Sequence, residues 1–389
     1  MKRSFISKIY YVFLAVLLAA AVLPASIKKA GASELSPDFV AAKSAYLCDY
    51  GSGTLIYSKN ETERKPIASM TKIMLLLLAF EKEAAGQISF DDRITISENA
   101  SGMGGSQVFL QADGEYNVGE LIKSIIISSA NDSSVAIAEL MFGSEENAVD
   151  AMNEKAKSLN LADTLFSNCT GLTRPTQYSC AKDVAVMLSE LIKYDKYFLY
   201  SKIYLDEMEH EGGRKTQMTN TNKLVKFYNG CDGGKTGFTN EAGFCLAATA
   251  KRGATRLIGV VIGESDSKKR FADCSALFDY GFNNFASKCV VSSSEPSGYQ
   301  VEVKGGKLDF ADVSAEDNLY VFGRKNEKDN IRIDCVLSES VKAPIKKGDV
   351  VGKFVVYKDN VKIAEKNAVC LSDVHRKTYG DYLKEITSY

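Results

Sequence analysis

The chain has 389 residues, enough to bury more than one hydrophobic core, so two domains are expected. Its net charge is −1, but the first 32 residues carry five positive charges and no acid, so the remainder carries −6. That remainder lacks the basic excess that neutralises phosphates, and nucleic acid is therefore excluded as an expected partner.

The N-terminus has the composition of a secretory signal peptide, which we predict over residues 1–32. Three basic residues at the start precede the apolar run Ile9–Leu23, and Ala30-Gly31-Ala32 then offers a small-x-small cleavage site. An uncleaved membrane anchor is the alternative, but the run is short for a bilayer span. The sequence therefore predicts an exported protein in the cell wall or at the outer face of the cytoplasmic membrane.

After a predicted hairpin over residues 45–57, a Ser–x–x–Lys step opens a strongly apolar run that ends near Gly86. Pro66 favours a helix start, and residues three apart share a helix face, so Ser69 and Lys72 are expected to stand together at the first turn. A lysine that loses its proton is one way to activate a serine without histidine. The plainer alternative is a helix-capping Ser69 with Lys72 in solvent. Three other Ser–x–x–Lys matches show that the pattern alone decides nothing.

A second polar step, Ser129-x-Asn131, lies between two predicted helices. Helical runs are expected over residues 118–127 and 133–142, with Asn131 or Asp132 capping the second. Side chains at such a junction can point into a cleft. The alternative interpretation is an N-cap turn, which is compatible with catalysis.

A β section begins at Gly230 and is predicted to form an antiparallel meander. Lys235-Thr236-Gly237 lies on its first strand, and glycines on both sides of the lysine allow another backbone to approach closely. The plain alternative is a solvent-facing Lys235 on an edge strand. A helix is expected over residues 267–285.

The remainder of the chain is predicted to be β-rich. Residues 289–298 have linker composition, and residues 299–373 contain short strand patterns without a catalytic cluster. The tail places Tyr379, Tyr382, Leu383 and Ile386 on one face of a short helix. This face could lie on a membrane surface, or it could pack on its own domain as a frayed end.

The cysteines and histidines restrict the chemistry. Nine cysteines occur without a C-x-x-C pair, so zinc and thioredoxin-like spacings are absent and buried free thiols are favoured. With only His210 and His375, a three-histidine metal site is impossible, and a serine nucleophile would use lysine as its base. No metal or cofactor is expected.

Taken together, the three motifs are specific in order, spacing and setting. Ser69/Lys72, Ser129/Asn131 and Lys235-Thr236-Gly237 resemble the motifs of the penicillin-recognising acyl-serine transferases. More narrowly, the chain resembles the low-molecular-mass penicillin-binding proteins of the serine-type D-alanyl-D-alanine carboxypeptidase family, peptidase family S11. The resemblance continues into the β region around Ala343–Gly348 and covers nearly the whole exported chain.

The resemblance implies an α+β fold. A β-lactamase/transpeptidase-like domain, with an antiparallel sheet flanked by helices and a helical lobe, would be followed by a small all-β domain. The implied division is a signal peptide (1–32), a D,D-peptidase domain (33–288), a linker (289–298), a β-rich domain (299–373) and a short amphipathic tail (374–389).

The resemblance also implies a role for each motif residue. Ser69 would attack the carbonyl between the terminal D-alanines of a peptidoglycan stem peptide, and Lys72, with a pKa lowered by burial and by Lys235, would accept its proton. Ser129 would relay a proton to the leaving D-alanine, and Asn131 would hold Lys72 and the substrate amide.

The third motif would bind the substrate terminus. Lys235 and Thr236 would hold the terminal carboxylate, with Gly237 beside them, and the backbone N–H groups of Ser69 and Phe238 would form an oxyanion hole. Water would then hydrolyse the acyl-enzyme. β-Lactam antibiotics, which mimic the D-Ala-D-Ala end, would acylate Ser69.

Two departures and three rivals accompany this interpretation. Ala130 replaces the glycine of many relatives, and Thr170 stands where many have histidine. A D,D-endopeptidase acting on cross-links would use the same residues. A β-lactamase needs a deacylating glutamate, which residues 163–183 lack, and a non-enzymatic scaffold is disfavoured because every catalytic residue type is present.

Overall fold

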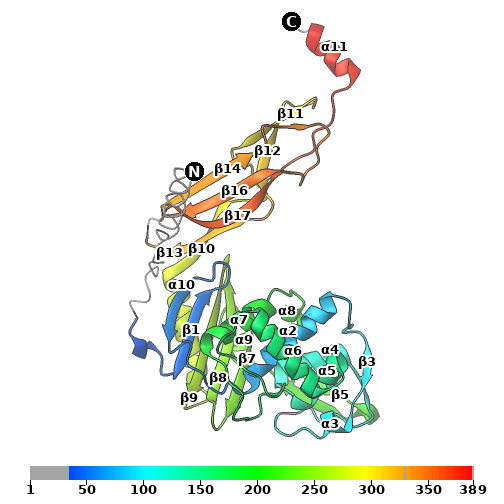
Figure 1. The fold of residues 1–389 in the computed structure, drawn as a ribbon, viewed down its shortest axis with the longest axis vertical. Helices are drawn as coiled ribbons and strands as arrows, with labels where there is room; N and C mark the ends of the chain where they lie inside the picture. Colours follow the sequence, from blue (N-terminus) through cyan, green and yellow to red (C-terminus); the bar gives the residue numbers. More distant parts are fainter. Residues whose placement is uncertain (1–34, 328–329, 388–389) are drawn as a thin grey trace, which may run out of the picture. The chain divides into compact units, whose positions relative to one another are not determined.

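The computed structural model describes residues 35–327 and 330–387 (Figure 1). The predicted signal peptide, residues 1–32, lies outside the described residues. The α+β fold is confirmed. Within the described ranges, none of the helices is both long and apolar enough to cross a membrane.

The N-terminal region of the described chain is built on one five-stranded antiparallel sheet with the order β2-β1-β9-β8-β7. Its strands are β1 (Ser44–Asp49), β2 (Leu55–Lys59), β7 (Cys231–Thr239), β8 (Gly243–Arg252) and β9 (Thr255–Glu264). The predicted hairpin and meander are therefore confirmed, and β7 is an edge strand. Chain segments more than two hundred residues apart meet in this sheet, because Ser44 of β1 pairs with Ile262 of β9.

Helices cover both faces of the sheet. On one face, α10 (Lys269–Asn284) packs so closely that a side chain on Gly259 would meet Phe278 at 3.1 Å. The alternate residues Ile258, Val260 and Ile262 belong to the core of the other face. There α7 (Ala181–Leu191) contacts both the sheet and α2 (Lys72–Ala84). The period of two in β9 thus separates two apolar faces, as expected for a sheet buried on both sides.

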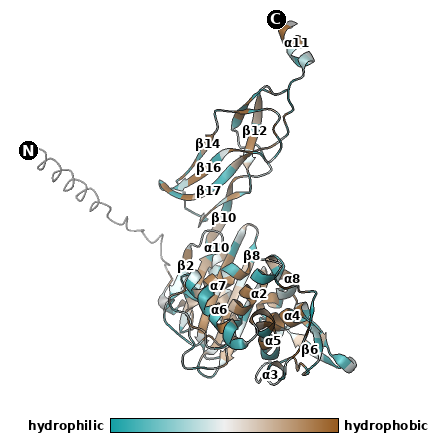
Figure 2. Cartoon of the chain, turned by 45° about the vertical axis from the view of Figure 1, so that its right-hand side comes forward, coloured by the Kyte–Doolittle hydropathy of each residue, from teal (hydrophilic) through white to brown (hydrophobic). Residues whose placement is uncertain are grey.

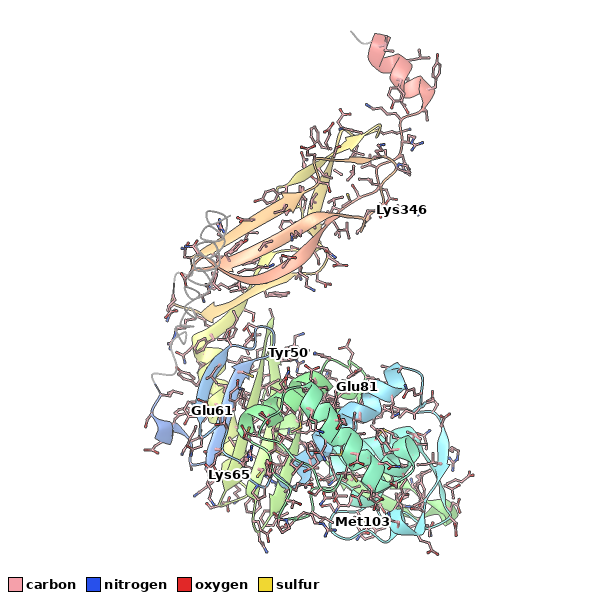
Figure 3. The ribbon with its side chains drawn as sticks, in the orientation of Figure 1. Tyr50, Glu61, Lys65, Glu81, Met103 and Lys346 are labelled. Carbon is pink, nitrogen blue, oxygen red and sulfur yellow. The ribbon has the colours of Figure 1, made fainter. Side chains whose placement is uncertain are left out.

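The helical lobe buries α2 almost completely, and its residues from Ile73 to Phe80 are at most 8% exposed. Hydrophobic colouring follows α2 and α4 in Figure 2. On the lobe's surface, Glu81 of α2 forms an ion pair with Lys155 (Figure 3). The other helical elements are η1 (Pro37–Phe39), η2 (Ala68–Thr71), α3 (Glu98–Ser101), α4 (Val118–Ser128), α5 (Asn131–Phe142), α6 (Glu145–Ser158), α8 (Tyr197–Ser201), η3 (Glu211–Gly213) and α9 (Leu224–Phe227).

Two small antiparallel ribbons alternate with these helices along the chain. The first pairs β3 (Arg93–Thr95) with β4 (Glu115–Asn117), and the second pairs β5 (Leu205–Glu209) with β6 (Lys215–Thr219). The second ribbon falls in the polar stretch 202–226, for which no secondary structure was predicted.

The C-terminal region is all-β up to its last helix. A six-stranded sheet has the order β14-β16-β17-β12-β11-β15 with its own buried core, and β10 pairs with β13. The strands of the C-terminal region are β10 (Phe285–Val291), β11 (Gln300–Lys304), β12 (Phe310–Ala315), β13 (Leu319–Arg324), β14 (Ile331–Leu337), β15 (Ser340–Lys342), β16 (Val350–Lys358) and β17 (Val361–Cys370). Strands β10, β12 and β15 were not predicted from the sequence. The predicted linker, 289–298, starts inside β10, and the domain boundaries remain predictions.

The chain ends in α11 (Tyr379–Thr387). Tyr379, Tyr382, Leu383 and Ile386 are between 45% and 79% exposed. The predicted helix is therefore present, and its aromatic and aliphatic side chains face solvent.

Candidate active site

Ser69 stands on a strained turn. It lies in η2, immediately before α2, and follows Ala68, whose φ of 47° is in the left-handed region. L-residues rarely adopt this conformation, and it persists only where neighbours enforce it. A Cβ on Gly171 would come within 2.1 Å of the Ala68 carbonyl oxygen, and one on Gly237 within 2.5 Å of the Ile67 carbonyl oxygen. Both glycines therefore let neighbouring backbone segments press against the serine turn.

Lys72 places its ammonium against Ser69 from inside the core. Its side chain is fully buried, and Nζ lies 3.0 Å from Ser69 Oγ, 2.7 Å from Asn131 Oδ1 and 2.5 Å from the Thr170 carbonyl oxygen. Burial lowers the pKa of Lys72 to about 7, although Cys169 and Asp132 act in the opposite direction. A neutral amine has two N–H bonds and one lone pair, so Asn131 and Thr170 can take the N–H bonds while the lone pair faces Ser69. The solvent-facing alternative for Lys72 is wrong.

Ser129 and Asn131 flank a sharp change of chain direction. Ser129 ends α4 with φ 63° and ψ 31°, and Asn131 is the first residue of α5. Asn131 donates its backbone N–H to the Ser106 carbonyl and its Nδ2 to the Gly104 carbonyl, both at 2.7 Å, while Oδ1 accepts from Lys72. The Ser129 hydroxyl is buried with no hydrogen-bond partner among the described residues. That hydroxyl is available for a proton-transfer role.

The capping prediction for this junction is wrong. The N-cap position of α5 is Ala130, which makes no side-chain hydrogen bond to the helix. Asp132 instead accepts the backbone N–H groups of Val108 and Leu110 at 3.1 Å each. It thereby fixes the loop whose Gly104 and Ser106 carbonyls hold Asn131. Met103, at the start of this loop, packs against the core (Figure 3).

Lys235 is buried on the edge strand β7, with 2% of its surface exposed. Burial, followed by the charges of Lys72 and Arg270, lowers its pKa well below the usual value. The solvent-facing alternative for Lys235 is wrong, because η2 packs against β7 and covers it. Thr236 is also buried, whereas Phe238 is 51% exposed and stacks on Phe244 with ring centroids 4.2 Å apart.

Arg270 is a site residue that the motifs do not reveal. It lies in α10, 35 positions after Lys235 in the chain, and donates from Nη1 to the Gly237 carbonyl at 3.2 Å. Its guanidinium also lies 5.4 Å from the Phe244 ring. Nε is buried without a partner among the described residues, and burial lowers the pKa of the group. The helix was predicted, but a single arginine in it carried no signal.

The structure therefore gathers residues from five segments of the chain into one site. Ser69, Lys72, Ser129 and Asn131 meet the β7 segment of Lys235, Thr236, Gly237 and Phe238. The contacts that Thr170, Gly171 and Arg270 make in the site were not predicted from the sequence. The charges of Lys72 and Arg270 both act on Lys235 here and add to the effect of burial in lowering its pKa. Among the described residues, no group of three or more histidine, cysteine or acidic side chains could hold a metal ion. The arrangement suits a serine nucleophile, a lysine base and a bound anion.

The sequence matches two family descriptions. Residues 31–266 match the peptidase S11 family, D-alanyl-D-alanine carboxypeptidase, and residues 285–376 match the C-terminal domain of penicillin-binding protein 5. D-alanyl-D-alanine carboxypeptidase DacF of Bacillus subtilis is 40% identical over 344 residues, which cover 88% of each chain.

Solved structures agree with these matches. Penicillin-binding protein 5 from Haemophilus influenzae is similar with a TM-score of 0.68 and 28% identity, covering 89% of this chain and 100% of that one. A peptidoglycan synthesis regulatory factor (PBP3) from Streptococcus pneumoniae gives a TM-score of 0.73 and 25% identity, covering 86% and 99%. The chain belongs to the D-alanyl-D-alanine carboxypeptidase family of serine peptidases and carries a C-terminal domain of the penicillin-binding protein 5 type.

Proposed function

We propose that this protein is a serine-type carboxypeptidase that removes the terminal D-alanine from peptidoglycan stem pentapeptides through an acyl-enzyme on Ser69. One observation carries the proposal: a fully buried Lys72 with a pKa of about 7 lies 3.0 Å from Ser69 Oγ. Such a lysine is neutral often enough near neutral pH to act as a general base. The names of the relatives support the same substrate class.

Acylation then follows from the positions of the groups. Neutral Lys72 takes the Ser69 proton as Oγ attacks the carbonyl carbon between the two D-alanines. The oxyanion would be stabilised by the backbone N–H groups of Ser69 and Phe238, since β7 runs beside the serine turn. Removal of one such donor typically costs about a hundred- to a thousand-fold in rate. The proton passes from Lys72 through Ser129 to the leaving amine, and the C–N bond breaks.

Recognition of the substrate terminus would fall to the cations on the other side of the site. Lys235, Thr236 and Arg270 bind the terminal carboxylate, whose charge relieves the repulsion among the buried cations. Asn131 holds the substrate amide and keeps Lys72 in place. Water then hydrolyses the ester, and Ser69 is released. β-Lactam antibiotics, which carry a carboxylate beside a reactive amide, would acylate the same serine.

The test compares the wild type with Ser69→Ala and, as a matched control, Ser52→Ala in the exposed β1–β2 turn. Each variant is incubated with a pentapeptide ending in D-Ala-D-Ala, and free D-alanine is measured. We expect release from the wild type and from Ser52→Ala only, with a penicillin adduct on the same two proteins. Fast penicillin hydrolysis without D-alanine release would instead identify a β-lactamase.

A D,D-endopeptidase is the closer rival, because it would use the same residues. Incubation with a cross-linked muropeptide distinguishes the two activities. Cleavage of the cross-link at a rate above that of D-alanine release would replace the carboxypeptidase assignment.

We also propose where the protein works. Export by residues 1–32 would place residues 33–288 outside the cytoplasm as the catalytic domain, with residues 289–298 as linker and 299–373 as a separate β-rich domain. Residues 374–389 would contact the membrane peripherally through the exposed face of α11. That face, with its aromatic rings and aliphatic side chains, has the composition of an interfacial helix.

A further inference from the structure

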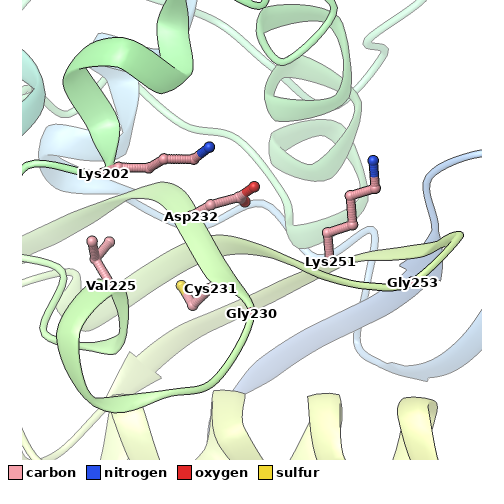
Figure 4. A pocket seen from close by; sticks show the side chains of 7 residues that line it. All are labelled: Lys202, Val225, Gly230, Cys231, Asp232, Lys251 and Gly253. Atoms are coloured by element: carbon pink, nitrogen blue, oxygen red, sulfur yellow. The ribbon is translucent and has the colours of Figure 1, made fainter.

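An open pocket lies at the start of β7, apart from the proposed catalytic residues. Its volume is about 430 Å³ (Figure 4). It is lined by Lys202, Val225, Gly230, Cys231, Asp232, Lys251 and Gly253. None of these residues contacts Ser69 or Lys72 by any described hydrogen bond, so the pocket needs an explanation of its own.

Two lysines, Lys202 and Lys251, line this pocket, and a third cation, Arg256, contacts the lining residues. Lys251 of β8 pairs directly with Arg256 of β9, which places two like charges opposite each other on one face of the sheet. Arg256 lies 4.6 Å from the Phe198 ring and Lys202 lies 5.5 Å from the same ring. A like-charge pair across two strands is destabilising unless something compensates for it.

The only acidic side chain in the pocket lining compensates for one of these charges. Asp232 binds the Arg256 guanidinium through both carboxylate oxygens, each at 2.8 Å. Lys202 and Lys251 are exposed and form no ion pair within residues 35–327 and 330–387. Figure 4 shows the Asp232 and Lys251 side chains on the same side of the strands. The pocket thus keeps two uncompensated ammonium groups on a chain whose exported part carries −6.

We propose that this pocket binds a phosphate group of an anionic polymer built from polyol or sugar phosphates. Lysine ammonium groups bind phosphate as point charges, and Lys202 and Lys251 supply two such groups to one pocket. The volume exceeds that of a phosphate alone and leaves room for an adjoining polyol unit. A lipid bilayer fits less well, because Val225 is the only aliphatic residue in the lining and offers little apolar surface to acyl chains.

The test measures binding of fluorescently labelled poly(glycerol phosphate) to the full exported chain by anisotropy, at low and at moderate salt. We expect saturable binding that weakens with salt. The double variant Lys202→Gln/Lys251→Gln should bind about tenfold or more weakly, because charge-assisted hydrogen bonds are lost. Val225→Glu, which keeps both lysines but adds a carboxylate to the pocket, should weaken binding as well.

The matched control is Lys182→Gln/Lys288→Gln, which removes two exposed lysines elsewhere and changes the net charge equally. It should bind like the wild type. Equal weakening in both double variants, or no binding by the wild type, would overturn the proposal. Binding to phosphatidylglycerol vesicles but not to the polymer would assign the pocket to a membrane instead. D-Alanine release should be unchanged in every variant, so a failure of the carboxypeptidase proposal would be seen separately.

Discussion

At the scale of single residues, Lys72 links the hydrophobic core to the proposed chemistry. An ammonium buried without solvent is costly, so the folded chain favours its neutral form. The same leucine-rich helix that removes water from Lys72 also positions it against Ser69. Burial therefore lowers the pKa of Lys72 far enough for it to act as a base. The charge of the neighbouring cation lowers the pKa of Lys235 rather than that of Lys72.

The pH dependence of acylation should report the fraction of Lys72 that is neutral. Only neutral Lys72 accepts the serine proton, so the second-order rate of acylation by a fluorescent penicillin should rise with pH and level off above a midpoint near 7. Lys72→Arg, which stays charged, should lose the rise and about a hundred- to ten-thousand-fold in rate. A profile without inflection between about pH 5 and pH 9 would contradict the role of Lys72 as base.

Arg270 should act on the substrate carboxylate. With Arg270→Leu, kcat/KM for a peptide ending in a free carboxylate should fall about 10- to 100-fold, the value of a hydrogen bond to a charged group. For the same peptide with a C-terminal amide, kcat/KM should fall far less. Arg332→Leu, in the C-terminal sheet, is the control and should change kcat/KM for neither peptide. Equal losses on both peptides would show that Arg270 only positions the Gly237 strand.

At the scale of secondary-structure elements, the helices and strands with a strong local pattern of apolar residues were predicted from the sequence. The apolar run of α2, the alternation of β8 and the β-branched run of β9 were sufficient. The β5–β6 ribbon was missed because β5 buries only Met208 of its five residues, so no alternation appears. Strand β15 is three residues long, too short for a pattern.

The candidate site was predictable where chemistry depends on side-chain type. Ser69, Lys72, Asn131 and Lys235 carry recognisable groups at family spacings. The Thr170 carbonyl was not predictable, because any residue offers a carbonyl and only the loop conformation directs it at Lys72.

Gly171 should be essential for the serine turn. Gly171→Ala would force a Cβ against the Ala68 carbonyl at φ +84°, so we expect a loss of more than about 2 kcal/mol in the free energy of unfolding. Acylation should slow at the same time. Gly143→Ala has a similar φ of +83° with no atom within 4 Å of the added Cβ, and should cost only about 1 kcal/mol with normal acylation. Urea unfolding and penicillin labelling measure both effects, and equal behaviour of the two variants would refute the contact argument.

At the scale of the whole molecule, catalysis and attachment are assigned to separate parts. The catalytic region and the C-terminal sheet each have their own buried core. The exposed apolar face of α11 belongs to neither core. A change in the tail should therefore alter where the protein resides but not how it reacts.

Removal of residues 379–389 should test this division. Co-sedimentation with anionic vesicles should fall to background, while D-alanine release from a soluble pentapeptide stays at the full-length level. The double variant Tyr382→Ser/Ile386→Ser should reduce sedimentation in the same direction without shortening the chain. Undiminished sedimentation of both would mean that α11 does not mediate membrane contact.

The pairing of β1 with β9 has a kinetic consequence. The sheet cannot close until residue 262 is available to residue 44, and such non-local pairings make folding slow. Strand β7 joins this sheet only through β8, so the serine turn lacks its neighbour until late in the process. Covalent labelling of Ser69 by penicillin should therefore appear with the final folding phase, which makes the antibiotic a reporter of sheet closure during refolding.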